Sequence, residues 1–288
     1  MSITLATPDV ANLGQVLEAL RSWQHDGMPI QLHPGDIGWA WQIGASALAE
    51  RVRIWSLDGS NHAVGLLDGP TLLRLAVAPE ASENEELAAR ILTDVTDPSR
   101  GVLPSGTSSV EARFGTALRS GIQDAGWMGD EPWTPFARDL TAPVQECGMR
   151  IETVGPELAN ARVQVQNASF DNSRFSEERW RTMANGPAYT DARCLLAYNE
   201  QGLAVATATV WSAGINRPGL IEPMGVAGNQ RGHGYGTAIT LAAAAALQEM
   251  GSSSALVCAE SANVGAVATY KAAGFTCHPE VHDFRRNV

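Results

Sequence analysis

The sequence predicts an α/β fold built twice, as two similar tandem domains that each hold a mixed, mostly antiparallel sheet flanked by helices. Strand-like and helix-like segments occur in the same order in both halves of the chain, with a repeat of about 145 residues. A repeat of that length indicates duplication of a whole domain, because the units of solenoid proteins are far shorter. The chain of 288 residues is long enough for two cores.

The C-terminal half has the clearer pattern of elements. Ser176 is placed to cap one predicted helix, whose Trp180 and Met183 fall on a single face. Turn residues, such as Asn199-Glu200-Gln201-Gly202, separate the predicted strands. The predicted elements are, in order, the strand Arg150–Val154, the helix Pro156–Ser169, the helix Phe175–Asn185, the strands Ala192–Tyr198, Leu203–Trp211 and Leu220–Val226, the helix Thr237–Glu249, the strand Ser253–Ala259, the helix Asn263–Ala273 and a last strand after Gly274-Phe275.

The N-terminal half follows the same order with weaker signals. Its last helix ends in Gly126-Trp127, much as that of the C-terminal half ends in Gly274-Phe275. We therefore expect a first domain over residues 1–142, a linker over 143–149 and a second domain over 150–288. The predicted elements of the first domain are the helix Val10–Trp23, the strands Arg51–Leu57, Ala63–Leu67 and Leu72–Ala78, the helix Glu83–Val95, the strand Ser109–Phe114, the helix Ala117–Ala125 and the strand Pro135–Leu140.

Charge and cysteine usage limit the partners and the compartment. The formal net charge of -11 at pH 7 argues against nucleic acid and an anionic membrane surface, and it favours a cationic ligand. The 4 cysteines lie far apart without a CxxC motif, which is typical of reduced thiols in the cytoplasm. We find no signal-peptide pattern, no apolar run long enough to cross a bilayer and no residue spacing that indicates a metal site. The expectation is a cytoplasmic monomer or homodimer.

The most informative segment is Arg231-Gly232-His233-Gly234-Tyr235-Gly236, which joins the strand ending at Val226 to the helix beginning at Thr237. Glycine has no Cβ, so the backbone N–H groups of such a segment can close around a bulky anion. The helix N-terminus adds unpaired N–H donors and partial positive charge. The segment therefore predicts a pyrophosphate site, although glycines alone also suit a plain tight turn. His233 faces either solvent or a phosphate.

Two motifs in the C-terminal half together resemble one protein family. The strand ending in Met224-Gly225-Val226, a gap of four residues and the R-G-H-G-Y-G segment resemble the Q/R-x-x-G-x-G/A motif of GNAT-type N-acetyltransferases. Further on, Asn263, Tyr270 and Gly274-Phe275 fit the family's N-x-x-A-x-x-x-Y-x-x-x-G-F segment. The resemblance covers the C-terminal half well and the N-terminal half only by layout. Two such domains are similar to the tandem members of the family, which include the mycothiol synthases.

The resemblance implies that the co-substrate is acetyl-CoA. Family members hold its pyrophosphate on the glycine segment, and its pantetheine arm pairs with the splayed strand before that segment as an extra strand would. The reaction is a direct attack of an amine on the thioester, through a tetrahedral oxyanion. The cofactor-binding residues implied for this chain are Met224, Gly225, Val226, Arg231, Gly232, His233, Gly234, Tyr235, Gly236, Thr237 and Asn263.

The reaction needs a base, an oxyanion donor and an acid. In the family, the tyrosine that corresponds to Tyr270 lies near the coenzyme sulfur. A phenol with a pKa of about 10 is protonated at neutral pH and can give its proton to the leaving thiolate. A backbone N–H near Val226 would serve the oxyanion. Glu222 is the candidate base, because it has the strand parity of Met224 and Val226. The alternatives are that Tyr270 only packs between helix and sheet, and that Glu222 is a solvated strand residue.

The N-terminal half departs from the family pattern at the corresponding loop, Pro79–Glu86. This loop has no glycine and no arginine, and it carries four glutamates, so we expect a degenerate copy that binds no cofactor. The segment Gln31–Trp41 is expected to be an aromatic loop that either lines the acceptor pocket or ties down a long connection.

The acceptor is expected to be the primary amine of a small, cationic molecule, which suits an acidic chain. Asp171, Glu177 and Glu178 could approach such a ligand, or they are solvated charges of a helix start. Protein N-termini and lysines stay open as acceptors. A non-catalytic acyl-CoA-binding protein, regulatory or structural, is the alternative function.

Overall fold

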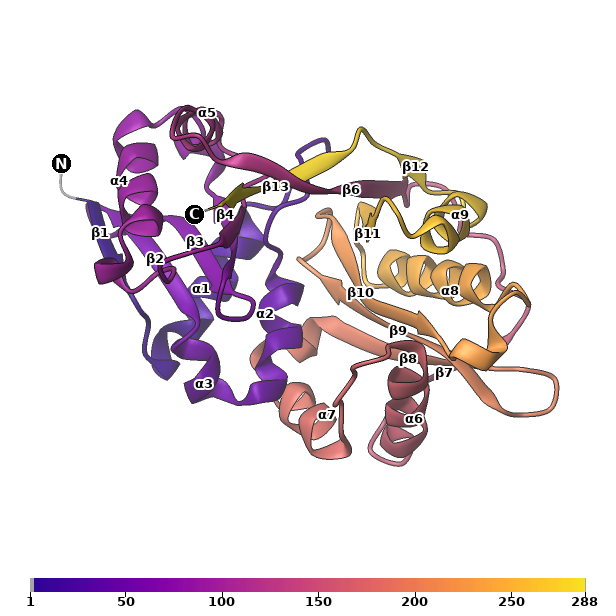
Figure 1. Ribbon diagram of the computed structural model, residues 1–288. Coiled ribbons are helices and arrows are strands. Elements are labelled where there is room, and N and C mark those ends of the chain that lie inside the picture. Colours follow the sequence, from indigo (N-terminus) through magenta and orange to yellow (C-terminus); the bar gives the residue numbers. More distant parts are fainter. Residues whose placement is uncertain (1–2, 288) are drawn as a thin grey trace. The chain divides into compact units, whose positions relative to one another are not determined.

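The chain folds into two compact units, and each unit contains segments from both halves of the sequence. The computed structural model describes residues 3–287 (Figure 1). The first unit comprises Met1–Pro34, Ala45–Trp133 and Glu280–Val288, and the second comprises Gly35–Gly44 and Thr134–Pro279. Residues 143–149, where we expected a linker, therefore lie within the second unit. The division differs because the last strand of the sequence completes the sheet of the first unit.

The first unit contains a sheet with the strand order β1-β2-β3-β4-β5-β13-β6. Neighbouring strands are antiparallel except β4 and β5, which are parallel. The strands are β1 (Ile3–Ala6), β2 (Val52–Leu57), β3 (Ser60–Leu67), β4 (Leu72–Val77), β5 (Ser108–Glu111), β6 (Met128–Asp139) and β13 (Val281–Arg286), and β6 continues into the second unit from Thr134.

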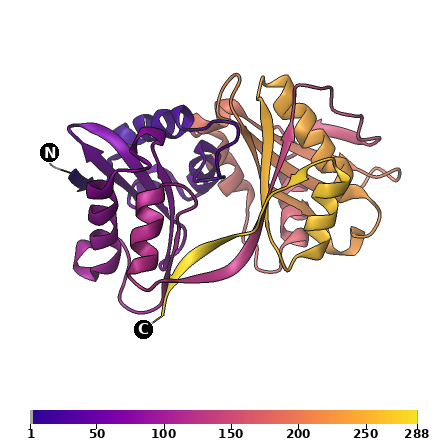
Figure 2. The ribbon, with the colours of Figure 1, turned by 90° about the horizontal axis from the view of Figure 1, so that it is seen from above.

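Helices of the first unit bury one apolar side against this sheet. In α1 the buried residues Leu13, Val16, Leu17 and Leu20 recur at helical spacing. Two further helices, α4 and α5, lie side by side (Figure 2). The helices are α1 (Leu13–Ser22), α3 (Ala45–Ala49), α4 (Glu85–Thr96) and α5 (Thr116–Asp124).

The second unit contains the strand order β6-β11-β10-β9-β8-β7, with β12 added to β6. The pair β10 and β11 is parallel, and β7, β8, β9 and β10 are antiparallel to their neighbours in the meander. The strands are β7 (Arg150–Thr153), β8 (Ala192–Tyr198), β9 (Ala204–Ser212), β10 (Gly219–Val226), β11 (Ser254–Glu260) and β12 (Thr276–Cys277).

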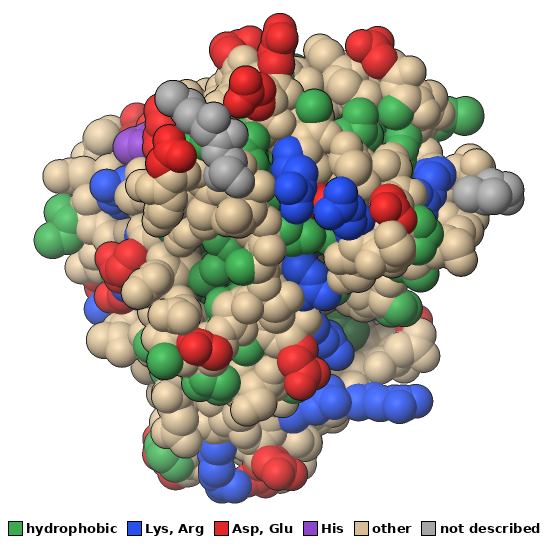
Figure 3. Space-filling view, turned by 90° about the vertical axis from the view of Figure 1, so that its left-hand side faces the viewer, with side chains coloured by type: hydrophobic (Ala, Val, Ile, Leu, Met, Phe, Trp, Pro, Cys, Tyr) green, Lys and Arg blue, Asp and Glu red, His purple; other side chains and the backbone are tan. Residues whose placement is uncertain are grey.

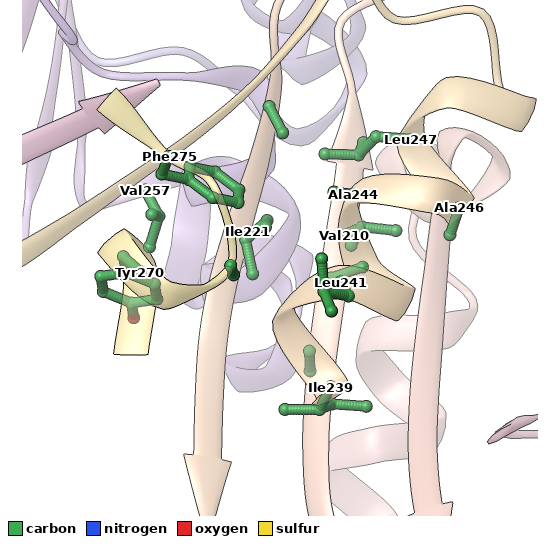
Figure 4. Close-up of a cluster of buried hydrophobic side chains, with 14 of the residues drawn as sticks. Val210, Ile221, Ile239, Leu241, Ala244, Ala246, Leu247, Val257, Tyr270 and Phe275 are labelled. Atoms are coloured by element: carbon green, nitrogen blue, oxygen red, sulfur yellow. The ribbon is translucent and has the colours of Figure 1, made fainter. Parts of the chain in front are cut away.

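Helices cover both faces of the second sheet. In Figure 1, α8 and α9 lie on one face and α6 and α7 on the other. The helices are α2 (Pro34–Ala40), α6 (Ala159–Ser169), α7 (Glu177–Ala184), α8 (Tyr235–Glu249) and α9 (Val264–Ala272). Between α8, α9 and the sheet lies a buried cluster that includes Ile221, Val257, Ile239, Tyr270 and Phe275 (Figure 4).

The segment Gln31–Trp41, expected to be a loop, is helical from Pro34 onward. The reason for its weak helical signal is packing against Trp211. A Cβ on Gly35 would lie 2.6 Å from the Trp211 side chain, and one on Gly38 would lie 2.3 Å from its ring. Glycine lowers helix propensity at both positions, and the close approach of the indole outweighs that loss.

Both acidic and basic side chains occur on the face shown in Figure 3, and several of the basic ones lie in a band down its middle. None of the helices within residues 3–287 has both the length and the apolar character needed to cross a bilayer. In the same range, no three His, Cys, Asp or Glu side chains come together as metal ligands would.

Candidate functional site

The strands β10 and β11 separate near the middle of the second sheet. Their parallel ladder joins Gly219 to Ala255 and Leu220 to Leu256 and goes no further. On its other side β10 stays paired with β9 as far as Val226. The edge of β10 that faces away from β9 is therefore open over its last residues, and a cavity of about 540 Å³ lies there.

A bulge divides β10 at Glu222 and Pro223. Ile221 pairs with Val210 and Met224 with Ala208, so β10 has one residue more than β9 between these pairs. The alternation of side chains is broken there, and Glu222 does not share a regular strand parity with Met224. The parity argument for Glu222 as the base is therefore wrong.

The cavity brings together nearly all of the residues expected to bind the cofactor. Of these, only His233 does not line it. The sequence motifs missed several further lining residues, two of them at the end of α6. The predicted residues that line the cavity are Met224, Gly225, Val226, Arg231, Gly232, Gly234, Tyr235, Gly236, Thr237 and Asn263, and the additional ones are Ser169, Phe170, Gln230, Gly265, Ala266 and Thr269.

The glycine segment turns β10 into α8 through two left-handed residues. Gly232 has φ +83° and Gly234 has φ +79°, a conformation that side chains disfavour, while a Cβ at either position would meet nothing within 4 Å. Backbone conformation, not space, therefore requires these glycines. The helix α8 begins at Tyr235, earlier than Thr237, and its N-cap Gly234 supplies no side-chain cap. The first N–H groups of α8 are thus available for a ligand in the cavity.

The side chains of Arg231 and His233 make contacts that hold the glycine segment in place. The Arg231 guanidinium donates a hydrogen bond of 2.9 Å to the backbone oxygen of Ser169. The exposed His233 ring stacks on Tyr235 with its centroid 5.6 Å away, and its Nδ1 lies 3.0 Å from the backbone oxygen of Arg231. Neither bond uses a group of α8.

The end of α6 forms one wall of the cavity because Gly225 lets it approach. A Cβ on Gly225 would lie 2.6 Å from Cβ of Ser169 and 2.9 Å from the ring of Phe170. This wall was not predicted, since α6 and β10 are far apart in sequence and share no motif.

Asn263 begins the helix beside the glycine segment. Its side chain accepts a hydrogen bond of 3.1 Å from the N–H of Ala266, so it is the N-cap of α9. Capping fixes where α9 starts and keeps Gly265 and Ala266 against the cavity.

Tyr270 lies in the buried cluster and does not line the cavity. Its ring is 5.4 Å from that of Phe136 and 6.2 Å from that of Phe275, and only 5% of the residue is exposed. In Figure 4 its hydroxyl oxygen points away from Phe275. Burial raises the pKa of Tyr270 above its usual value, and the negative charge of Glu222 and that of Cys258 raise it further. The two predicted catalytic residues are thus close enough to interact.

Aromatic side chains of the second unit form a cluster that the sequence did not reveal, and Trp211 of this cluster contacts Glu222. The Trp211 Nε1 donates a hydrogen bond of 2.6 Å to the backbone oxygen of Glu222. Tyr189 meets the Trp211 ring edge-on at 6.1 Å, and Trp39 of α2 stacks on Phe175 at 5.1 Å. These residues come from four separate segments of the second unit, so no local pattern joins them.

The acidic residues considered for the acceptor lie at and before the start of α7. Glu177 accepts hydrogen bonds from Asn160 at 2.9 Å and Arg181 at 3.0 Å. Asp171 and Glu178 are exposed. None of the three lines the cavity along β10.

Comparison with known proteins identifies the family of the second unit. Residues 160–275 match the model of the Acetyltransferase (GNAT) family. The second unit belongs to the GNAT family. A search of curated proteins finds no match.

Solved structures extend the GNAT likeness to the whole chain. A GCN5-related N-acetyltransferase from Sphaerobacter thermophilus is 20% identical with a TM-score of 0.58, over 99% of this chain and 95% of that one. A tandem GNAT protein from the clavulanic acid biosynthesis pathway is 16% identical with a TM-score of 0.61, over 99% and 98%. The N-myristoyltransferase of Saccharomyces cerevisiae, solved with bound myristoyl-CoA, is 8% identical with a TM-score of 0.60, over 99% and 78%. The predicted tandem GNAT-like α/β fold is confirmed.

Proposed function

We propose that this protein is an N-acetyltransferase that uses acetyl-CoA and acetylates the primary amine of a small, cationic molecule. One observation carries the proposal: a single cavity holds both the open edge of β10, from Met224 to Val226, and the uncapped start of α8. An extended chain with amide groups can pair with the open edge of β10, and a pyrophosphate can accept hydrogen bonds at the uncapped start of α8.

Each part of acetyl-CoA has a proposed partner in this cavity. The pyrophosphate accepts hydrogen bonds from the N–H groups of Gly232 to Thr237, at a helix N-terminus whose partial charge is positive. The pantetheine arm pairs with the backbone of Met224 and Val226. The N-myristoyltransferase, which shares the fold, was solved with an acyl-CoA, and that likeness supports the proposal.

The chemistry of transfer divides among three groups. A neutral amine attacks the thioester carbon, and the C–S bond breaks as the amide forms. The Val226 N–H stabilises the oxyanion, and the Tyr270 hydroxyl gives its proton to the departing sulfur. The raised pKa of Tyr270 suits this role, because the hydroxyl stays protonated at neutral and mildly alkaline pH. Glu222 takes the proton of the amine, directly or through water.

The acceptor is proposed to approach from the aromatic cluster beside Glu222. Rings of Tyr189 and Trp39, which are partly exposed, can hold a cationic molecule by cation–π attraction, and the net charge of -11 raises the local concentration of cations. The amine to be acetylated must arrive without its proton, which is why a carboxylate base is needed nearby. We also infer a reducing compartment such as the cytoplasm, since the 4 cysteines are free thiols.

A screen of amines with acetyl-CoA, read as released thiol, tests the activity. Acetyl transfer to a polyamine, an amino sugar or another small cationic amine supports the proposal. If acetyl-CoA binds but no amine or peptide reacts, the protein is a non-catalytic acyl-CoA-binding module, the alternative that the same cavity would serve. Calorimetry gives the stoichiometry, for which we expect one acetyl-CoA per chain.

A further inference from the structure

The two units share the backbone geometry that follows the strand at the proposed site. In the first unit Ala78 (φ -57°, ψ 138°) links β4 to a 3₁₀ turn at Pro79–Ala81. In the second unit Ala227 (φ -50°, ψ 131°) links β10 to a 3₁₀ turn at Gly228–Gln230. Because these dihedrals agree closely, Val77 on β4 corresponds to Val226 on β10.

Val77 also directs its backbone groups as Val226 does. The N–H of Ala78 donates to the backbone oxygen of His62 on β3, at 2.9 Å, so the groups of the preceding residue point away from β3. On β10 the N–H of Ala227 donates to Val205 at 3.0 Å, next to the start of β9, and Val226 faces the cavity. The first unit thus retains the strand edge on which the second unit is proposed to bind an amide.

A side chain of the first unit occupies this edge. The Gln31 Nε2 donates a hydrogen bond of 3.2 Å to the backbone oxygen of Val77, and the Val77 N–H donates one of 2.9 Å to Gln31 Oε1. Gln31 is only 3% exposed. One buried carboxamide therefore satisfies both backbone groups of Val77, as the amide of an extended ligand would.

The other half of the site is closed in the same way. Asn84 caps α4, and its side chain accepts a hydrogen bond of 2.9 Å from the N–H of Leu87. The matching helix α8 begins with Gly234 and no such cap. The hollow lined by Val77, Asn84, Leu87 and Gly115 is too narrow to admit a water molecule.

We propose that Gln31 is a built-in substitute for the pantetheine amide, so that the first unit closes its own ligand edge and excludes a second acyl-CoA. The comparison with pantetheine rests on the function proposed for the second unit. The closing of β4 by Gln31 does not depend on it and is tested separately.

Hydrogen exchange of the intact protein, followed by mass spectrometry at the Val77 amide, tests the closing. In Gln31→Leu, which keeps the bulk and removes both hydrogen bonds, exchange at Val77 should be faster by about tenfold or more. Gln24→Leu is the matched control, because Gln24 is another buried glutamine of the first unit and donates to the backbone oxygens of Leu20 and Leu32. Exchange at Val77 that rises no more in Gln31→Leu than in Gln24→Leu would overturn the proposal.

Gln31→Glu keeps the inference testable if the leucine variant does not fold. Its side chain retains an acceptor for the Val77 N–H, so Val77 should stay protected, and fast exchange there would contradict the assignment. In the unaltered protein, saturating acetyl-CoA should leave Val77 exchange unchanged; slower exchange would mean that the edge is open to ligand. Acetyl-CoA should instead slow the exchange of the Val226 amide. If exchange at Val226 alone does not slow, that result counts against the proposed function and not against the role of Gln31.

Discussion

The Arg231 guanidinium and the backbone oxygen of Ser169 form a hydrogen bond of 2.9 Å. Ser169 is the last residue of α6, where carbonyl groups lack helical partners and a positive charge is stabilising. This bond ties the glycine segment to the helix end that packs on Gly225. The arginine of the motif thus shapes the cavity through its side chain as well as through its place in the turn.

Arg231→Glu is expected to weaken acetyl-CoA binding by about ten- to a hundredfold or more. The substitution removes the bond to Ser169 and adds a negative charge beside the proposed pyrophosphate position. Calorimetric titration with acetyl-CoA measures the effect. Arg179→Glu makes the same charge change on the exposed surface of α7 and should bind normally. Equal acetyl-CoA affinities of the two variants would show that Arg231 does not contribute to binding.

Tyr270→Phe is expected to keep acetyl-CoA affinity and to lower kcat by about a hundredfold. The ring still fills the cluster beside Phe136, while the proton donor is lost. Because the pKa of Tyr270 is raised, the unaltered enzyme should show no loss of this acid below about pH 10. Single-turnover rates with a verified amine measure the change, and Tyr198→Phe, on β8, is the control. Unchanged turnover in Tyr270→Phe would leave the residue a packing role only.

Glu222→Gln is expected to lower kcat by about a hundredfold or more while acetyl-CoA affinity stays within about twofold. The side chain keeps its size and loses the ability to take a proton. Raising the pH should restore part of the rate, because more of the amine is then neutral without help. Glu260→Gln, at the exposed end of β11, is the control for a lost negative charge. A pH–rate profile that keeps its shape in Glu222→Gln would argue for another base.

Asp283 in the first unit is expected to make stability depend on pH. Burial and repulsion from Glu111 raise the pKa of Asp283 to about 6, although Arg113 and Arg74 oppose the rise. Its unfolded pKa is about 3.9, so the folded state binds the proton more tightly. The resulting contribution to stability is complete below about pH 4 and is lost as the pH rises through about 6.

Asp283→Asn should abolish this dependence. The free energy of unfolding of the unaltered protein, minus that of the variant, should fall by up to about 3 kcal/mol between pH 4 and pH 7. Urea unfolding at several pH values measures it. A difference that stays constant, or that rises with pH, would show that Asp283 is not protonated in the folded protein near pH 5.

Sequence alone predicted the elements best where turn residues separate them. The strand Ala192–Tyr198 has the predicted bounds, and Ser176 caps its helix by accepting a hydrogen bond from the N–H of Arg179. The strand–glycine–helix motif likewise predicted the residues around the cavity along β10. Local signals of this kind need no knowledge of distant partners.

The parts that sequence did not reveal depend on distant contacts. The bulge at Glu222 is set by pairing with β9, so simple alternation gave a wrong parity. The sequence did not predict α2, because Gly35 and Gly38 lower its helix propensity. The need for glycine at these two positions is explained by the close contact with Trp211, which only the structure shows. The position of β13 in the sheet is set by its pairing with β5 and β6, and no residue within β13 indicates that position in the sequence.

The position of β13 between β5 and β6 has a consequence for synthesis on the ribosome. Most strands of the first unit are made early, but the one that joins β5 to β6 is made after the whole of the second unit. At about 5–20 residues per second, translation of the second half of the chain takes on the order of ten seconds. The nascent first unit must wait through that interval with two sheet edges unpaired, and its sheet is completed only after the second unit has been made. Of the two units, the one that is begun first is therefore completed last.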